Sequence, residues 1–176
     1  IHGQGLVEVD AVISTASGML TFGALLDADD APRALRRQAQ EAQVSHSAFS
    51  VQLGLRNRID APSHSTCFLP PMERQGEVFT PCDDGVRWLV YDSPTVTLPD
   101  LAPAGGSVIE MYPPVRRDFP VDGWDEERKR AILDRAVEAL ARVHPLDIAV
   151  QRVVSPREFR DNLNLYRGAV YGLSPQ

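Results

Sequence analysis

The chain has 176 residues, 43% of them hydrophobic, so it can bury one sizeable core but is too short for two ordinary domains. Its 18 basic and 24 acidic residues give a net charge of -6. This charge argues against binding to nucleic acid or to an anionic membrane, because both require clustered Lys and Arg. We therefore expect one domain, residues 1–176, that binds neither.

The cysteines and the hydropathy pattern bear on the cellular compartment. Cys67 and Cys82 are too few for the disulfide framework of a small secreted protein, and they favour a reducing cytoplasm. No stretch reaches the roughly 18 apolar residues that a transmembrane helix needs. The sequence begins at Ile1 rather than Met, with a strand-like segment close behind, which suggests a piece of a longer protein.

The first 45 residues predict one strand and two helices. Residues 6–14 are apolar and β-branched, which predicts a strand that is partly buried at Val7, Val9, Val12 and Ile13. Residues 19–26 favour a short helix. Pro32 suits the first turn of a second helix, which we expect to continue to residue 42.

Residues 47–55 form the clearest strand pattern. Large apolar side chains occupy positions 49, 51, 53 and 55, which is the period of a strand with one buried face. The opposite face carries the small residues Ala48, Ser50 and Gly54. Either a closely packed helix or a bulky ligand could lie against that face, and the helix is the favoured interpretation.

The rest of the chain predicts four more strands and two helices. The strands are expected at residues 66–69, 86–91, 108–112 and 148–154, with turns such as 81–85 between them. A long helix is expected at residues 124–143, ended by Pro145, with an apolar face made of Ile132, Leu133, Ala136, Val137, Leu140 and Val143. Ser155, Pro156 and Glu158 predict an N-cap, a first-turn proline and a capping box for a short helix that ends near residue 163.

This order of elements predicts the fold class. Several consecutive strands favour antiparallel pairing, and the helices can pack on the resulting sheet. The expected fold is therefore α+β, with a mixed, largely antiparallel sheet.

Most familiar catalytic and cofactor motifs are absent from the sequence. Gly3, Gly5, Gly18 and Gly23 do not fit the G-x-G-x-x-G turn that binds a dinucleotide. The histidines, at positions 2, 46, 64 and 144, lack the spacing of a zinc site, so no metal is expected. His64 and Cys67 are close in sequence, but the sequence does not show whether they meet in space. Carboxylates such as those at 83–84 and 125–127 suit turns and the start of a helix.

Three segments together resemble one family. Residues 93–112 contain Pro94, Pro99 and Pro103 before Gly105 and Gly106, which predicts a stiff, non-helical connection into a buried strand. Residues 9–14 read Val-Asp-Ala-Val-Ile-Ser, and residues 166–173 read Tyr-Arg-Gly-Ala-Val-Tyr-Gly-Leu. On these segments the chain resembles the phytoene dehydrogenase-like flavoprotein oxidoreductases, the carotenoid desaturases and their relatives. It departs from the family at Leu98, where an acid usually precedes the second proline.

The resemblance implies a function and a site. It implies the substrate-binding domain of an FAD-dependent oxidoreductase, similar to that of flavin amine oxidase-type enzymes, in which the sheet forms one wall of a cavity for a long apolar or isoprenoid-like substrate. It places the FAD-binding domain in the longer protein, so this fragment alone is expected to be inactive and to bind no FAD. The implied substrate-binding residues lie in the turn where the substrate domain returns to the flavin domain: Tyr166, Arg167, Gly168, Tyr171 and Gly172. The two tyrosines could line the cavity or fill the core.

Other functions remain open on the sequence alone. The chain could be a flavin amine oxidase relative, or a non-catalytic binding or interaction module that shares the fold. Desaturases, isomerases and saturases are not separated by these motifs. Loss of the flavin-binding domain would expose an apolar surface, which predicts a homodimer of the fragment at high concentration. Peripheral membrane attachment of the longer protein is also left open.

Overall fold

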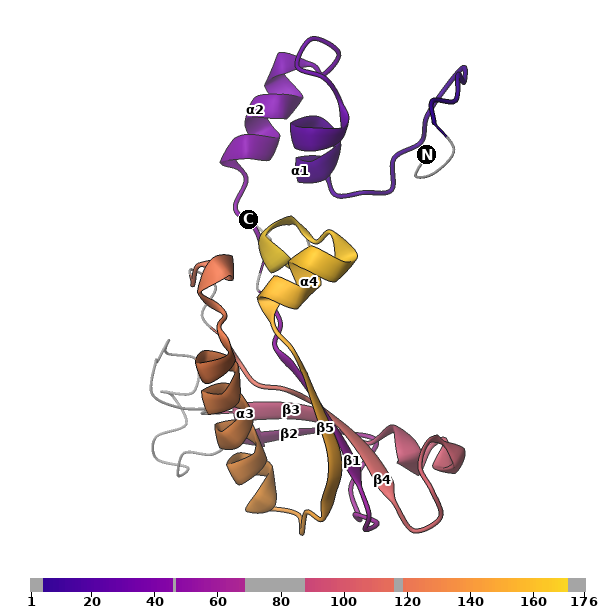
Figure 1. Cartoon of the computed structure of the whole chain (residues 1–176), viewed down its shortest axis with the longest axis vertical. Coiled ribbons are helices and arrows are strands. Elements are labelled where there is room, and N and C mark those ends of the chain that lie inside the picture. The colour runs from indigo at the N-terminus through magenta and orange to yellow at the C-terminus, as the bar shows by residue number, and fades with distance from the viewer. Residues whose placement is uncertain (1–4, 46, 69–87, 116–118, 171–176) are drawn as a thin grey trace. The chain divides into compact units, whose positions relative to one another are not determined.

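A computed structural model describes residues 5–45, 47–68, 88–115 and 119–170. The chain divides into two compact units, residues 1–43 and 44–176, and each is described by itself (Figure 1). A single domain over residues 1–176 stays a prediction. The turn predicted at 81–85 and the site residues Tyr171 and Gly172 lie outside the described residues.

The first unit contains the two predicted helices. Helix α1, Gly18–Leu20, continues into a π-helical turn at Thr21–Leu25, and the Ser17 hydroxyl accepts a hydrogen bond from the Leu20 amide. Helix α2 spans Arg33–Glu41, with Pro32 as its N-cap. Both helices are therefore confirmed close to their expected bounds.

The prediction of a strand at residues 6–14 is wrong. The described part of this segment forms no strand, and its apolar side chains face outward, with Leu6 104%, Val12 81% and Ile13 91% exposed. Val7 and Val9, which were also expected to be partly buried, are exposed. A strand is held by hydrogen bonds to a neighbouring strand, and none of the described residues pairs with this segment. Its β-branched composition alone therefore does not make it a strand.

The second unit is built on a five-stranded antiparallel sheet in the order β2-β3-β4-β1-β5 (Figure 1). The strands are β1 Ser50–Leu55, β2 His64–Phe68, β3 Trp88–Asp92, β4 Ser107–Tyr112 and β5 Ile148–Val154. Helix α3, Glu126–Ala141, joins β4 to β5 with a 3₁₀ turn before it, and helix α4, Pro156–Leu163, follows β5. The predicted α+β class, with an antiparallel sheet and helices packed on it, is confirmed.

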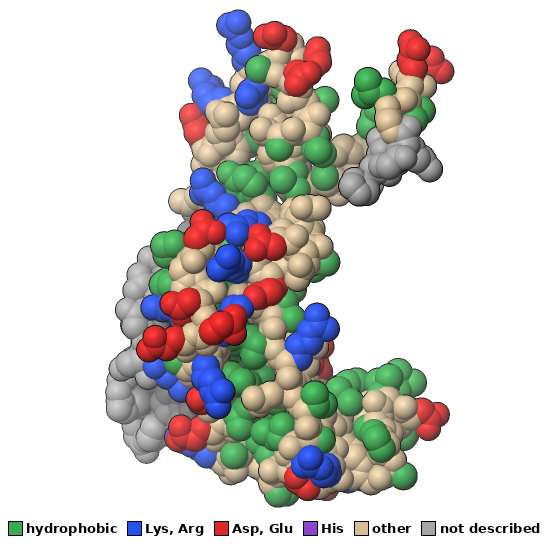
Figure 2. Space-filling view, viewed as in Figure 1, with side chains coloured by type: hydrophobic (Ala, Val, Ile, Leu, Met, Phe, Trp, Pro, Cys, Tyr) green, Lys and Arg blue, Asp and Glu red, His purple; other side chains and the backbone are tan. Residues whose placement is uncertain are grey.

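One face of this sheet forms the core. The four large apolar residues at 49, 51, 53 and 55 are all buried, as their alternation predicts. Neighbouring strands add Leu89, Tyr91, Ile109 and Met111 to the same face. Helix α3 covers it with Leu133, Ala136 and Leu140. The outward side of α3 carries intermixed acidic and basic side chains (Figure 2).

The helix therefore lies on the opposite face of β1 from the one we expected. The small residues of β1 are not covered by α3, because its core residues cluster with the large ones. The space at Gly54 is filled from the next strand, since a Cβ there would lie 2.7 Å from Cγ1 of Val150. Val143, expected on the apolar face of the helix, is 50% exposed because α3 ends at Ala141.

The proline-rich segment contains two short helical turns. These 3₁₀ turns span Pro94–Val96 and Pro99–Leu101, so the expectation of a non-helical connection is wrong. Each turn begins with proline, whose fixed φ suits a first helical position and whose missing N–H costs nothing there. Gly105, with φ of 81°, then turns the chain into β4, as predicted.

Candidate functional site

Helix α4 begins with the predicted capping box. The Ser155 amide donates to Oε2 of Glu158 over 2.9 Å, and the Arg157 amide donates to Oγ of Ser155 over 3.3 Å. Ser155 is fully buried. These bonds satisfy backbone donors that the first turn of a helix leaves free. They fix the direction in which the chain leaves the sheet.

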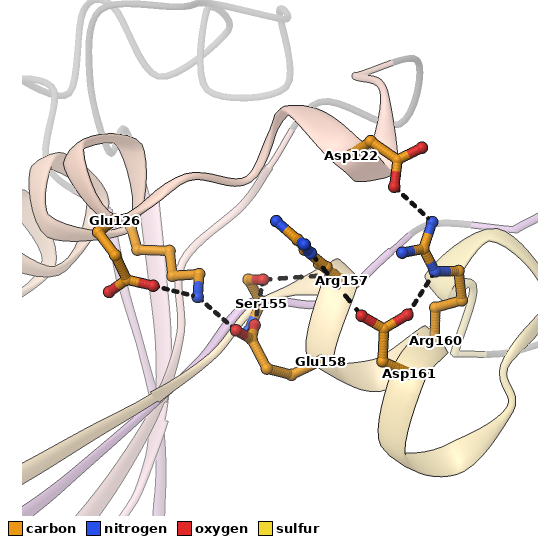
Figure 3. A network of polar contacts seen from close by, with 8 residues as sticks. Asp122, Glu126, Ser155, Arg157, Glu158, Arg160 and Asp161 are labelled. Atoms are coloured by element: carbon orange, nitrogen blue, oxygen red, sulfur yellow. Dashed lines mark hydrogen bonds and ion pairs between the residues drawn. The ribbon is translucent and has the colours of Figure 1, made fainter.

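A half-buried lysine, Lys129, ties α3 to this cap, and Figure 3 labels its two partners, Glu126 and Glu158. Nζ of Lys129 donates to Oε1 of Glu126 over 2.8 Å and also to Oε1 of Glu158, and its side chain is only 14% exposed. Burial raises the pKa of Glu158, but the hydrogen bonds from Lys129 and Ser155 outweigh it and bring that pKa to about 2. Glu158 therefore stays ionised and holds the two helices together.

A second ion pair supports α4 from its other side. Nη1 of Arg160 donates to Oδ1 of Asp122 over 2.8 Å, and Nε of the same arginine donates to Oδ1 of Asp161 over 2.7 Å (Figure 3). Asp122 belongs to the 3₁₀ turn Val121–Gly123 that precedes α3. Helix α4 is thus tied to the start of α3 at two points, through Glu158 to Lys129 and through Arg160 to Asp122.

The predicted substrate turn folds back on the start of α4. The structure brings Tyr166, Arg167 and Gly168 together in a 3₁₀ turn, with the Arg167 guanidinium carbon 5.2 Å from the centre of the Tyr166 ring. Gly168 has a φ of 70°, and a Cβ there would lie 2.4 Å from the carbonyl oxygen of Pro156. Tyr166 is half-buried and Arg167 is exposed. The backbone contact gives the turn a packing role, and its role in substrate binding stays a prediction.

The face of the sheet opposite α3 is a second candidate site, where the sequence indicates a ligand only as the less favoured occupant beside the small residues of β1. It carries half-buried apolar side chains on three strands: Trp88 and Val90 on β3, Val108 and Tyr112 on β4, and Val154 on β5. The strand register places Val90 of β3 opposite Tyr112 of β4, so these two side chains lie next to each other. The sequence of residues 88–91, Trp-Leu-Val-Tyr, could have indicated this second apolar surface. Side chains on both faces of this strand are apolar, whereas a strand with one buried face needs apolar side chains on that face only.

The proline-rich segment lines a cavity of about 360 Å³. Its wall includes Arg58, Asp100, Thr95 and Ser107. The two hydroxyls already bind the backbone, because Oγ of Ser107 accepts from the Ile59 amide over 3.1 Å and Oγ1 of Thr95 accepts from the Val108 amide over 3.3 Å. They hold the segment to the sheet.

The structure separates His64 from Cys67. They lie three positions apart on β2, so they point to opposite faces of the sheet. Nδ1 of His64 lies 2.5 Å from Oδ1 of Asp92, while Cys67 packs against the core. The two therefore do not form a nucleophile and base. Within the described ranges, no three His, Cys, Asp or Glu side chains group as metal ligands.

The two main helices of this unit do not suit the pyrophosphate of FAD. The start of α3 is capped by Asp125, whose Oδ1 accepts from the Arg128 amide over 2.8 Å, and Glu126 and Glu127 follow in its first turn. Glu158 lies in the first turn of α4. A phosphate needs free amides and no nearby negative charge, so these helix ends would repel it. In the part of the chain described by the structure, no helix is long and apolar enough to cross a membrane.

The fold and the site together define an α+β sheet unit with one face covered by α3 and an opposite face that is partly apolar in the described residues. Two curated proteins named phytoene desaturase (lycopene-forming) are similar to the chain. The one from Pseudescherichia vulneris is 28% identical over 181 residues, covering 97% of this chain and 36% of the relative. The one from Pantoea ananas is 29% identical over 175 residues, covering 94% of this chain and 35% of the relative.

These similarities confirm the resemblance to carotenoid desaturases that the three sequence segments indicated. The chain spans about a third of the length of the curated relatives it matches. No protein-family model matches the chain.

Proposed function

We propose that the chain is the substrate-binding part of a phytoene desaturase-like, FAD-dependent oxidoreductase that acts on a long apolar or isoprenoid-like substrate. The observation that carries this proposal is the similarity to two phytoene desaturases over almost the whole chain. The half-buried apolar side chains that β3 and β4 carry on the face opposite α3 support it physically, because the apolar part of a long molecule gains most of its binding energy by leaving water.

The proposal divides the work between this chain and the rest of the protein. FAD would accept a hydride from the substrate, and the protein would supply shape and orientation. The capped, acidic helix ends of the second unit do not suit the cofactor's pyrophosphate. This chain would instead hold the substrate on the apolar side chains of β3 and β4, and the turn at Tyr166–Gly168 would be a separate contact to the substrate.

Flavin content tests this division. We expect the full-length protein to purify with about one FAD per chain, and the 176-residue chain to purify without flavin. The measurement is the absorbance of the purified proteins, followed by release and quantification of the flavin. A full-length protein that lacks flavin and does not bind added FAD would contradict the oxidoreductase assignment. A stoichiometric flavin on the 176-residue chain would contradict the division of work.

A further inference from the structure

A row of polar side chains crosses the apolar face of the sheet. The register places Asp92 between His64 on β2 and Glu110 on β4. It places Gln52 between Glu110 and Arg152 on β5. Side chains directly opposite each other on one face have Cβ atoms about 5 Å apart. The row therefore contains one polar residue from each of the five strands.

Glu110 lies at the centre of this row. Its Oε1 accepts hydrogen bonds from Oγ of Ser50 over 2.9 Å and from Nε2 of Gln52 over 3.3 Å. Both donors are neutral, and among the described residues Glu110 forms no ion pair. Asp92 differs, because His64 lies 2.5 Å from it. In the described parts of the chain, Glu110 is thus a half-buried carboxylate whose second oxygen accepts no hydrogen bond, so it can accept one from a further donor.

A ligand made of hydrocarbon alone does not match this surface. If it covered Glu110, it would remove water from a carboxylate without supplying a hydrogen bond, which is costly. Apolar side chains nevertheless flank the row, with Val90 and Tyr112 on one side and Val108 on the other. The surface therefore suits a molecule that is mostly apolar and has one polar group.

We propose that the ligand of this sheet face is a long apolar molecule with a hydrogen-bond-donating group, a hydroxyl or an amine, that binds Glu110. This inference rests on the proposed function for its apolar part and adds the polar group. The donor would bind the carboxylate of Glu110, and the amide of Gln52 would lie beside it. The apolar part would lie on Val90, Val108 and Tyr112.

Matched isoprenoids test the inference on the 176-residue chain. Trp88 lies on this face and Trp124 is buried in the core, so quenching of tryptophan fluorescence can follow binding. The probes are a C15 isoprenoid alcohol, the corresponding amine and the corresponding hydrocarbon. We expect the alcohol or the amine to bind at least about tenfold more tightly than the hydrocarbon, as a hydrogen bond to a charged group allows.

The variant Glu110→Gln should remove this preference and leave hydrocarbon binding unchanged or stronger. Glu138→Gln on the exposed side of α3 is the matched control and should keep the preference. If Glu110→Gln fails to fold by circular dichroism, the comparison of ligands on the unaltered chain still decides. Equal affinities for all three probes, or tightest binding of the hydrocarbon, would overturn the inference but leave the proposed function standing. No binding of any probe would overturn both.

Discussion

Gly168 shows how one residue can set the path of the chain beside the candidate site. Its φ of 70° is strained for any other residue, and its backbone packs against the carbonyl oxygen of Pro156. The neighbouring Arg167 adopts a φ of 53° although it has a side chain. After Asn164, with a φ of 54°, has ended α4, these two adjacent left-handed residues turn the chain back onto the start of that helix.

Substitution of Gly168 by Ala should destabilise the second unit by about 2–4 kcal/mol, because it adds a steric clash to the strain of a positive φ. Gly105→Ala is the matched control, since Gly105 has a φ of 81° but an added Cβ would meet no atom within 4 Å. It should cost only about 1 kcal/mol. Urea unfolding measures both. Equal losses in the two variants would show that the contact with Pro156 does not matter.

At the scale of single elements, the accuracy of the sequence prediction depends on how local the signal is. The capping box at Ser155 and Glu158 is predictable because its bonds join residues three apart. Strand β5 has the bounds that its sequence predicts. The prediction for residues 6–14 is wrong because a strand depends on a partner elsewhere, which composition does not reveal. The polar row through Glu110 needs the register of five strands, which no single segment contains.

The ion pair between α3 and α4 predicts a dependence of stability on pH. The pKa of Glu158 is about 2 in the folded chain, and its ordinary value is 4.5. The ion pair should therefore contribute its full stabilisation of the folded state above pH 4.5, and this contribution should be lost as the pH falls towards 2. The difference corresponds to about 3 kcal/mol. Hydrogen bonds to Glu126 and Glu158 raise the pKa of Lys129 above its ordinary value of 10.5. The stabilisation of the folded state by the charged lysine is therefore present below pH 10.5 and is lost at higher pH.

Glu158→Gln should therefore lower the free energy of unfolding by about 1–3 kcal/mol at pH 7 and by almost nothing near pH 2. Glu127→Gln removes an exposed carboxylate from the same region and should change stability by less than about 0.5 kcal/mol at either pH. Unfolding by urea at several pH values measures this. A loss in Glu158→Gln that does not vary with pH would contradict the role of the charge.

At the scale of the whole molecule, the proposed function gives the sheet face opposite α3 to the substrate and FAD to a parent protein of which this chain would be a part. The chain matches only about a third of each phytoene desaturase, so both assignments need the full-length protein. A charge placed on the face should disturb substrate binding without removing the flavin. Val90 suits this purpose because it lies on β3 opposite Tyr112 and Thr66, at the centre of the apolar surface.

The most direct test is the loss of flavin colour when a long unsaturated isoprenoid is added without oxygen to the full-length protein. We expect the unaltered protein to lose its flavin absorbance, and Val90→Glu to keep its FAD but react at least about tenfold more slowly, because the new charge is desolvated under the substrate. Val143→Glu places the same charge on an exposed site beyond α3 and should react normally. A protein without flavin, a flavin that the isoprenoid does not reduce, or equal rates in the unaltered protein and Val90→Glu would contradict the account.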